Sequence, residues 1–166
     1  MGETDRQMWI AAVACCAALI GLAFAPWVEA RGQEFDGTGL PLMLGISRGE
    51  LLIAAATAMA AISLVAIRRP DLQRLSAPVL SIVALGAFML CASTVLADWR
   101  LNGCGFLSGV HNEGTCPIGA LWAVAPTLPV WAATGLSALL TLWFSAYWFR
   151  LQRRSSNVSE VSNGWA

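Results

Sequence analysis

The chain has 166 residues, of which 57% are hydrophobic and only 12% are charged, and its ten arginines balance ten acidic residues to give zero net charge. This composition leaves too little polar surface for a soluble globular protein of this size. The neutral charge provides no basis for nucleic-acid binding.

Four apolar stretches approach the roughly 20 helical residues that are needed to cross a hydrocarbon core. They cover residues 8–26, 48–67, 77–97 and 126–150. We therefore expect an all-α membrane protein whose residues 1–154 form one domain, a four-transmembrane-helix antiparallel bundle. Residues 155–166 are polar and low in hydrophobicity, which predicts a disordered cytoplasmic tail.

The first stretch ends in a pattern that resembles a signal-peptide cleavage site, Ala23-Phe24-Ala25. Its apolar run is longer than a usual signal core, and Pro26 directly after the site hinders cleavage. The sequence therefore predicts that this segment is retained as a membrane helix.

Small residues recur at every fourth position in the first and fourth stretches. They are Ala17, Gly21 and Ala25 in the first, and Ser137, Thr141 and Ser145 in the fourth. Such ridges let helices approach closely in a membrane, where packing drives association. Two interpretations stay open: packing within this bundle, or a docking face for a partner's helix.

Loop one, residues 27–46, contains Asp36-Gly37, which is a strong hairpin signal between runs of alternating polarity. It predicts a small exoplasmic β-hairpin over the bundle. Pro41 and the neighbouring glycines favour an irregular loop equally, so both alternatives remain.

Local signals mark the helix ends. Ser47 and Glu50 have the spacing of a capping box and predict the start of the second helix. Pro70, after two arginines, predicts its end. The short link at residues 71–76 makes the second and third helices antiparallel neighbours, and Pro126 suits the start of the fourth.

Loop two, residues 99–121, is rich in glycine and carries Cys104 and Cys116. In an oxidising compartment such a pair most often forms a structural disulfide, which would stabilise the fold by roughly 3 kcal/mol. Two alternatives remain: a redox-active thiol pair, although the chain lacks a Cys-x-x-Cys motif, and a zinc-type site that also uses His111.

The arginines predict the orientation, because cationic residues concentrate in cytoplasmic loops. Seven of them fall on the side of the two termini: Arg6, Arg68, Arg69, Arg74, Arg150, Arg153 and Arg154. Both termini are therefore expected in the cytoplasm. Ten arginines without a lysine, together with abundant alanine, indicate a GC-rich bacterial genome, so the expected location is the bacterial cytoplasmic (inner) membrane.

Tryptophans prefer the interface between hydrocarbon and water. Trp27, Trp99 and Trp122 are expected at the outer boundary, and Trp9, Trp143 and Trp148 at the inner one. Trp131 is expected to lie deeper, near a kink at residues 126–129 that could border an apolar groove. Trp27, Trp99, Trp122 and Trp131 are the candidate contacts to a partner or a lipid.

No aspartate, glutamate, lysine, arginine or histidine lies securely inside any stretch, whereas pumps and ion pathways need such groups. The sequence also contains no recognisable catalytic motif, and we expect neither an enzyme nor a cofactor. It favours a non-catalytic accessory or assembly subunit of a larger membrane complex. The alternatives are a protein that binds or transports a lipid or small molecule, and an exoplasmic thiol redox protein.

A short first helix that ends in Pro26-Trp27-Val28, followed by a glycine-rich exoplasmic turn, resembles small four-helix membrane proteins of actinobacteria, including the tryptophan-operon-associated membrane family. The resemblance covers the first half of the chain. A hairpin in loop one beside a covalently pinned loop is also claudin-like in outline, although the paired cysteines here belong to loop two. These resemblances imply the four-helix architecture and assign no functional residue.

Overall fold

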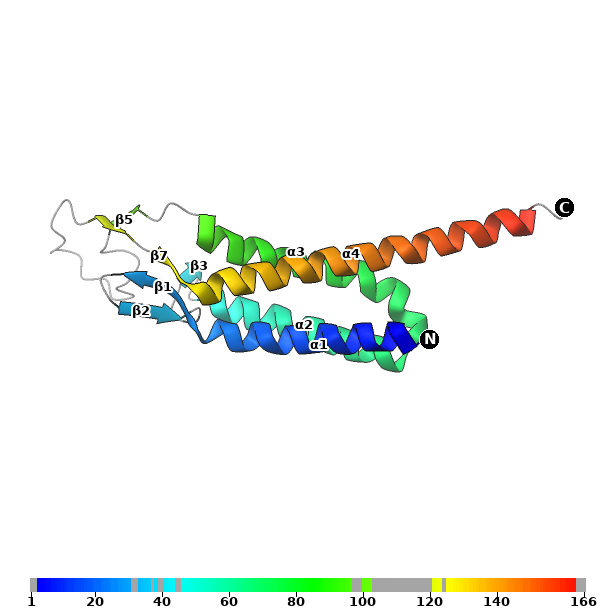
Figure 1. Ribbon diagram of the computed structural model, residues 1–166, viewed down its shortest axis with the longest axis horizontal. Coiled ribbons are helices and arrows are strands. Elements are labelled where there is room, and N and C mark those ends of the chain that lie inside the picture. The colour runs from blue at the N-terminus through cyan, green and yellow to red at the C-terminus, as the bar shows by residue number, and fades with distance from the viewer. Residues whose placement is uncertain are drawn as a thin grey trace.

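The structure is a computed structural model that describes residues 3–30, 33–36, 38, 41–43, 46–96, 100–102, 121–123 and 125–163. Four long helices lie side by side (Figure 1): α1 (Glu3–Ala23), α2 (Arg48–Arg68), α3 (Gln73–Leu96) and α4 (Leu128–Asn163). Both termini lie at one end of the bundle, the termini end, and short strands gather at the other, the cap end.

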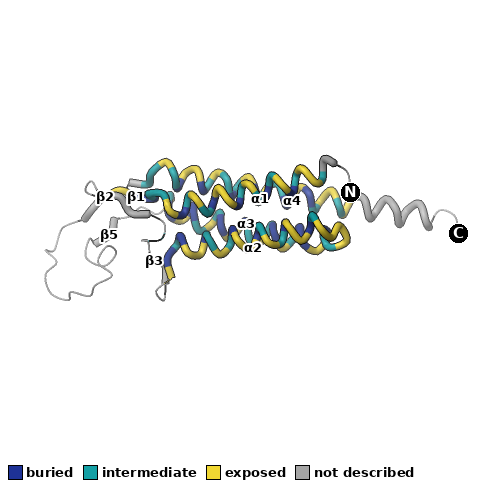
Figure 2. The backbone as a smooth tube through the Cα atoms, turned by 90° about the horizontal axis from the view of Figure 1, so that it is seen from below, coloured by how far each residue is buried: buried dark blue, intermediate teal, exposed yellow. Residues whose placement is uncertain are grey.

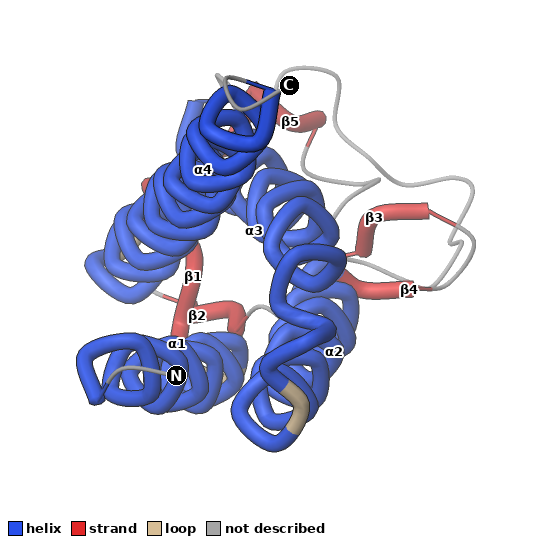
Figure 3. Tube along the Cα trace, turned by 90° about the vertical axis from the view of Figure 1, so that its right-hand side faces the viewer, coloured by secondary structure: helices blue, strands red, loops and turns tan. Residues whose placement is uncertain are grey.

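Each of the four helices is long and apolar enough to cross a membrane. α1 packs against α2 and α4, and α3 packs against the same two helices, so that consecutive helices are antiparallel neighbours around a square (Figure 3). The predicted four-helix bundle is confirmed. A short 3-10 helix, η2 (Pro70–Leu72), connects α2 to α3.

The predicted ends of α2 are confirmed. The hydroxyl of Ser47 accepts from the amide of Glu50 at 3.1 Å, and the Glu50 carboxylate accepts from the amide of Ser47 at 2.7 Å, so both halves of the capping box form. α2 ends at Arg68, two residues before Pro70. The helix therefore begins and ends where its local chemistry indicates.

The polar tail differs from its prediction. α4 continues to Asn163, whereas composition predicted a disordered segment from Ser155. Extending an existing helix fixes one residue per hydrogen bond and avoids the cost of nucleation, so a weakly helical sequence can continue a long helix. Residues 164–166 lie outside the described residues.

The core has a regular spacing that the sequence analysis did not detect. Buried positions alternate three and four residues apart in every helix: Trp9, Ala12, Cys16, Leu19 and Ala23 in α1; Leu52, Ala56, Met59, Ser63 and Ala66 in α2; Ala77, Leu80, Ala84, Ala87, Cys91 and Thr94 in α3; Val130, Ala133, Ser137, Leu140, Phe144 and Tyr147 in α4. A spacing of 3.5 residues is that of left-handed helix bundles. Buried residues line the interior of the bundle along its length (Figure 2).

Short strands form the cap. β1 (Pro26–Ala30) is the middle strand of an antiparallel sheet, between β2 (Gln33–Asp36) and β7 (Ala125–Pro126). Two smaller pairs join β3 (Pro41–Met43) to β4 (Ile46–Ser47), and β5 (Arg100–Asn102) to β6 (Leu121–Ala123). The sheet thus links the end of α1 to the start of α4.

The hairpin predicted in loop one is present, but its turn is not at Asp36-Gly37. Ala30 pairs with Gln33 and Pro26 with Asp36, so the chain reverses between Ala30 and Gln33, and Asp36 lies at the far end of β2. The connection has the sequence Arg31-Gly32, and two-residue hairpin loops favour a glycine. The Asp36-Gly37 pair is a stronger turn signal, so the sequence analysis placed the turn there instead.

The start of α4 is joined to β1 through Thr127. Its amide donates to the carbonyl of Trp27 at 2.9 Å, and its hydroxyl donates to the carbonyl of Pro26. The indole N–H of Trp27 donates in turn to the carbonyl of Leu22 at 2.7 Å, in the last turn of α1. Trp27 is fully buried. This joint explains why α4 begins at Leu128 rather than at residue 126.

Candidate functional site

The residues predicted to matter in loop two fall outside the described part of the chain. Cys104, His111, Cys116 and Trp99 lie outside the described residues, and so does the side chain of Trp122, whose backbone belongs to β6. The disulfide and its two alternatives therefore stay predictions.

The two other candidate contact residues have different surroundings. Trp131 is 53% exposed and lies on the outer surface of α4, near the start of that helix at Leu128. Its ring remains available to a lipid or partner. Trp27 is buried completely, which leaves it no surface for either contact.

The outer surface of the bundle has two sides of different character. α3 and α4 carry most of the exposed large apolar side chains: Leu75, Val79, Ile82, Leu85, Met89 and Leu96 on α3, and Leu128, Trp131, Leu139, Leu142 and Phe149 on α4. No such side chain is exposed on α1 between Ile10 and Phe24, or on α2 between Leu51 and Leu64. Between these limits the exposed residues, the small-residue face, are Ala14, Ala17, Ala18, Gly21, Ala54, Thr57, Ala58 and Ala61.

The two predicted small-residue ridges therefore have different surroundings. On α4, Ser137 is buried, and Ser145 shares a 2.6 Å hydrogen bond with Ser81 of α3, so this ridge packs inside the bundle. On α1, Ala17 and Gly21 are exposed and belong to the small-residue face. The first interpretation, packing within the bundle, describes the α4 ridge, whereas the α1 ridge is exposed and docking there stays a hypothesis.

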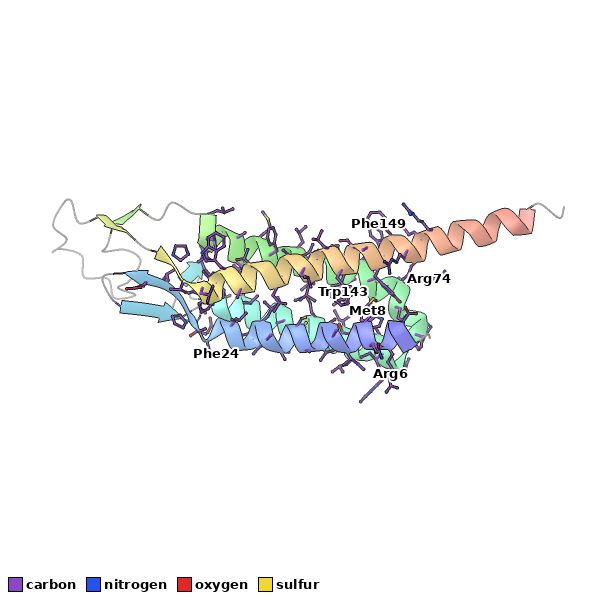
Figure 4. All side chains as sticks on the ribbon, viewed as in Figure 1. Arg6, Met8, Phe24, Arg74, Trp143 and Phe149 are labelled. Carbon is purple, nitrogen blue, oxygen red and sulfur yellow. The ribbon has the colours of Figure 1, made fainter. Side chains whose placement is uncertain are left out.

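A cleft opens between α1 and α4 at the termini end. It consists of two adjoining cavities of about 270 and 410 Å³ that share Met8, Trp143 and Arg150. The remaining lining residues of this α1–α4 cleft are Asp5, Gln7, Ala11, Ala146 and Tyr147. Figure 4 shows Met8 and Trp143 between the two helices.

Residue size explains why the helices diverge there. At the termini end the core contains Trp9, whose ring centroid lies 5.9 Å from that of Phe144 and 5.6 Å from that of Tyr147. At the cap end the buried positions of the two helices include the small residues Ala23 and Ala133, and the large buried side chain there, Trp27, comes from strand β1. The aromatic cluster holds α4 away from α1, and the end-on view shows α4 inclined across the bundle (Figure 3).

Both walls of the cleft change from charged to apolar along its length. Asp5 on α1 and Arg150 on α4 lie nearest the termini, whereas Ala11 and Trp143 lie deeper. The seven residues from Trp143 to Arg150 span about 10 Å of helix. The cleft therefore has a charged mouth and an apolar interior.

A buried polar chain supports the back wall. The hydroxyl of Tyr147 donates to Oε1 of Gln73 at 2.9 Å, and Nε2 of Gln73 donates to the carbonyl of Ala66 at 3.1 Å. These bonds join α4, α3 and α2 in a single layer. They hold the hydroxyl of Tyr147 on the core side of the wall.

We expect Gln73 and Tyr147 to be energetically coupled. Gln73→Leu and Tyr147→Phe should each lower the free energy of unfolding by about 1 kcal/mol, the size of a buried hydrogen bond. The double variant should lose less than the sum of the two, because both remove the same bond. A double-mutant cycle of unfolding in detergent measures the coupling, and strict additivity would contradict it.

A second polar junction lies at the cap end. Nη1 of Arg48 donates to the hydroxyls of Ser93 and Thr94, at 2.8 and 2.9 Å, and so fastens the start of α2 to the last turn of α3. Among the described residues no group of three or more histidine, cysteine, aspartate or glutamate side chains is placed to hold a metal ion.

The α1–α4 cleft and the small-residue face are thus the two surfaces that offer a site. Sequence analysis identified the α1 part of the small-residue face, at Ala17 and Gly21, but neither its α2 part nor the cleft, although Trp143 had been placed at a membrane boundary. No family model, curated protein or solved structure matches this chain.

Proposed function

We propose that this chain is a non-catalytic accessory or assembly subunit of a bacterial inner-membrane complex, which docks on a partner's transmembrane helix through the small-residue face of α1 and α2. The observation that carries the proposal is the unequal division of the outer surface. Between helices in lipid, association depends on close packing, and small side chains permit it. Large exposed side chains on α3 and α4 suit contact with lipid tails.

The orientation belongs to the same proposal. Arg6, Arg68, Arg74 and Arg150 all belong to the termini end of the bundle. With the cationic end in the cytoplasm, the strands of the cap face the exoplasmic side. The cap then offers a second contact surface to the partner.

The two alternatives have different support. A groove beside Trp131 is not favoured, because that side chain is on the outside of α4. Lipid binding is better supported at the α1–α4 cleft, at the opposite end of the bundle. A thiol redox role depends on Cys104 and Cys116, and the described cysteines, Cys15, Cys16 and Cys91, all belong to the long helices.

Three glycines provide a matched test of the docking face. A Cβ atom added to Gly21, Gly86 or Gly135 would meet no atom of a neighbouring element within 4 Å, and all three positions are exposed, so each can be tested with a leucine. Gly21 lies on the small-residue face, and the other two lie on α3 and α4. We expect Gly21→Leu to reduce recovery of a stoichiometric partner at least about tenfold, the factor that corresponds to 1.4 kcal/mol. Gly86→Leu and Gly135→Leu should leave recovery unchanged.

The measurement is quantitative mass spectrometry of the tagged protein purified in mild detergent from its own cells, with a photo-crosslinker at Ala58 to identify the neighbour. Equal recovery for all three leucine variants would refute docking through α1 and α2. So would a protein that purifies without any partner at fixed stoichiometry.

A further inference from the structure

We propose that the α1–α4 cleft binds one zwitterionic phospholipid, with the phosphate at Arg150, the headgroup ammonium at Asp5, and an acyl chain along Met8, Ala11 and Trp143. The proposal concerns a different surface from the small-residue face. It does not depend on a protein partner.

The order of groups along the cleft matches that of a lipid. Its mouth carries Arg150 and Asp5, and its walls become apolar within about 10 Å, toward Ala11 and Trp143. A phospholipid has the same sequence of a charged headgroup followed by hydrocarbon. Since the cleft lies between two neighbouring helices at the surface of the bundle, a lipid can enter it sideways from the bilayer.

The charges at the mouth are available to a ligand. The structure gives neither Asp5 nor Arg150 an ion pair or side-chain hydrogen bond among the described residues, although both line one cavity. A guanidinium binds phosphate in a planar, two-pronged arrangement. An ammonium beyond the phosphate complements the carboxylate, which disfavours a purely anionic headgroup.

The size and the walls of the cleft also suit the headgroup and the upper part of one acyl chain. A volume of about 410 Å³ lies within the range of about 300–1,000 Å³ that is typical of small-molecule sites. Trp143 and Tyr147 provide broad apolar surfaces, and Ala11 and Ala146 leave room beside them. The Tyr147 ring cannot swing into the cleft without breaking its hydrogen bond to Gln73.

Native mass spectrometry of the full-length, delipidated protein tests this with two defined lipids of equal chain length, phosphatidylethanolamine and phosphatidylglycerol, supplied at equal concentration. We expect one bound lipid per chain and a preference of about threefold or more for phosphatidylethanolamine, the size of one solvent-exposed ion pair.

Variants of the mouth should separate the two charges. Arg150→Gln should weaken binding of both lipids by about tenfold, as expected for loss of a charge-assisted hydrogen bond. Asp5→Asn should abolish the preference and leave phosphatidylglycerol binding intact. Arg68→Gln is the charge-matched control, because that exposed arginine ends α2 and does not line the cleft.

Filling the interior provides the second test. Ala146→Phe should exclude the acyl chain and remove bound lipid, because Ala146 lines the cleft, whereas Ala132→Phe, on the same helix but outside the cleft lining, should not. Unfolding temperatures of both variants show whether each remains folded. Lipid occupancy unchanged by Ala146→Phe in a folded protein would overturn the site, and a preference for phosphatidylglycerol would overturn the role of Asp5. Failure of docking in the glycine test would leave these results unaffected.

Discussion

Replacing Trp27 with alanine is expected to lower the free energy of unfolding by about 3–5 kcal/mol, the range for truncating a large buried aromatic side chain. The side chain is fully buried, and its indole N–H satisfies the carbonyl of Leu22 at the end of α1. Trp27 lies in strand β1, beyond the end of α1. Truncation therefore removes the packing of the ring and also exposes the atoms that the ring covers to water. Thermal unfolding in detergent measures the loss.

The matched control is Trp131→Ala. This tryptophan also lies toward the cap end, but it is 53% exposed on the outside of α4. Its truncation should change the unfolding free energy by less than about 0.5 kcal/mol, as surface substitutions usually do. Equal losses in the two variants would mean that Trp27 does not hold the joint between α1 and α4.

Replacing Phe144 with alanine should cost roughly 2 kcal/mol. Phe144 is 1% exposed and packs against Trp9 at the centre of the termini end. Inside a membrane the separated helices are solvated by lipid tails, so the transfer term largely cancels and the cavity term remains. The effect is therefore smaller than at Trp27, despite equal burial. Unfolding by a denaturing detergent provides the measurement.

Phe149→Ala serves as the control, since this residue is about 1.4 turns further along α4 and 56% exposed. It should be nearly neutral. We also expect Phe144→Ala to alter lipid retention in the α1–α4 cleft, because the cluster that separates the helices would be smaller. A stability loss at Phe149 as large as at Phe144 would argue against the orientation of α4 in which Phe144 faces the core and Phe149 faces outward.

Much of the architecture could be predicted because the signals that determine it are local. Hydrophobic length identified the four helices, and the chemistry of Ser47 and Pro70 determined both ends of α2. The cap was harder, because strand pairing is a property of two segments. β1 pairs with β7, almost a hundred residues away, and no turn signal reports such a partner.

The candidate surfaces were harder to predict from the sequence. The division between small and large exposed side chains depends on which face of each helix points outward, and that requires the packing. The 3.5-residue spacing of Ala12, Cys16 and Leu19 contained this information, but alanine and cysteine among many apolar residues do not mark a face. The charged mouth of the cleft depends on the tilt of α4, which follows from the sizes of Trp9 and Phe144.

The pairing of β1 with β7 has a consequence for biosynthesis. β1 follows the first helix out of the ribosome, and β7 emerges only after the second, third and long loop segments, immediately before α4. Until then that edge of β1 lacks its final neighbour, and Thr127 is not yet present to bind the carbonyl of Trp27. Packing of α4 against α1 is therefore a late event in assembly. A chain interrupted before its last span leaves the α4-facing side of α1 and one edge of β1 without their partners.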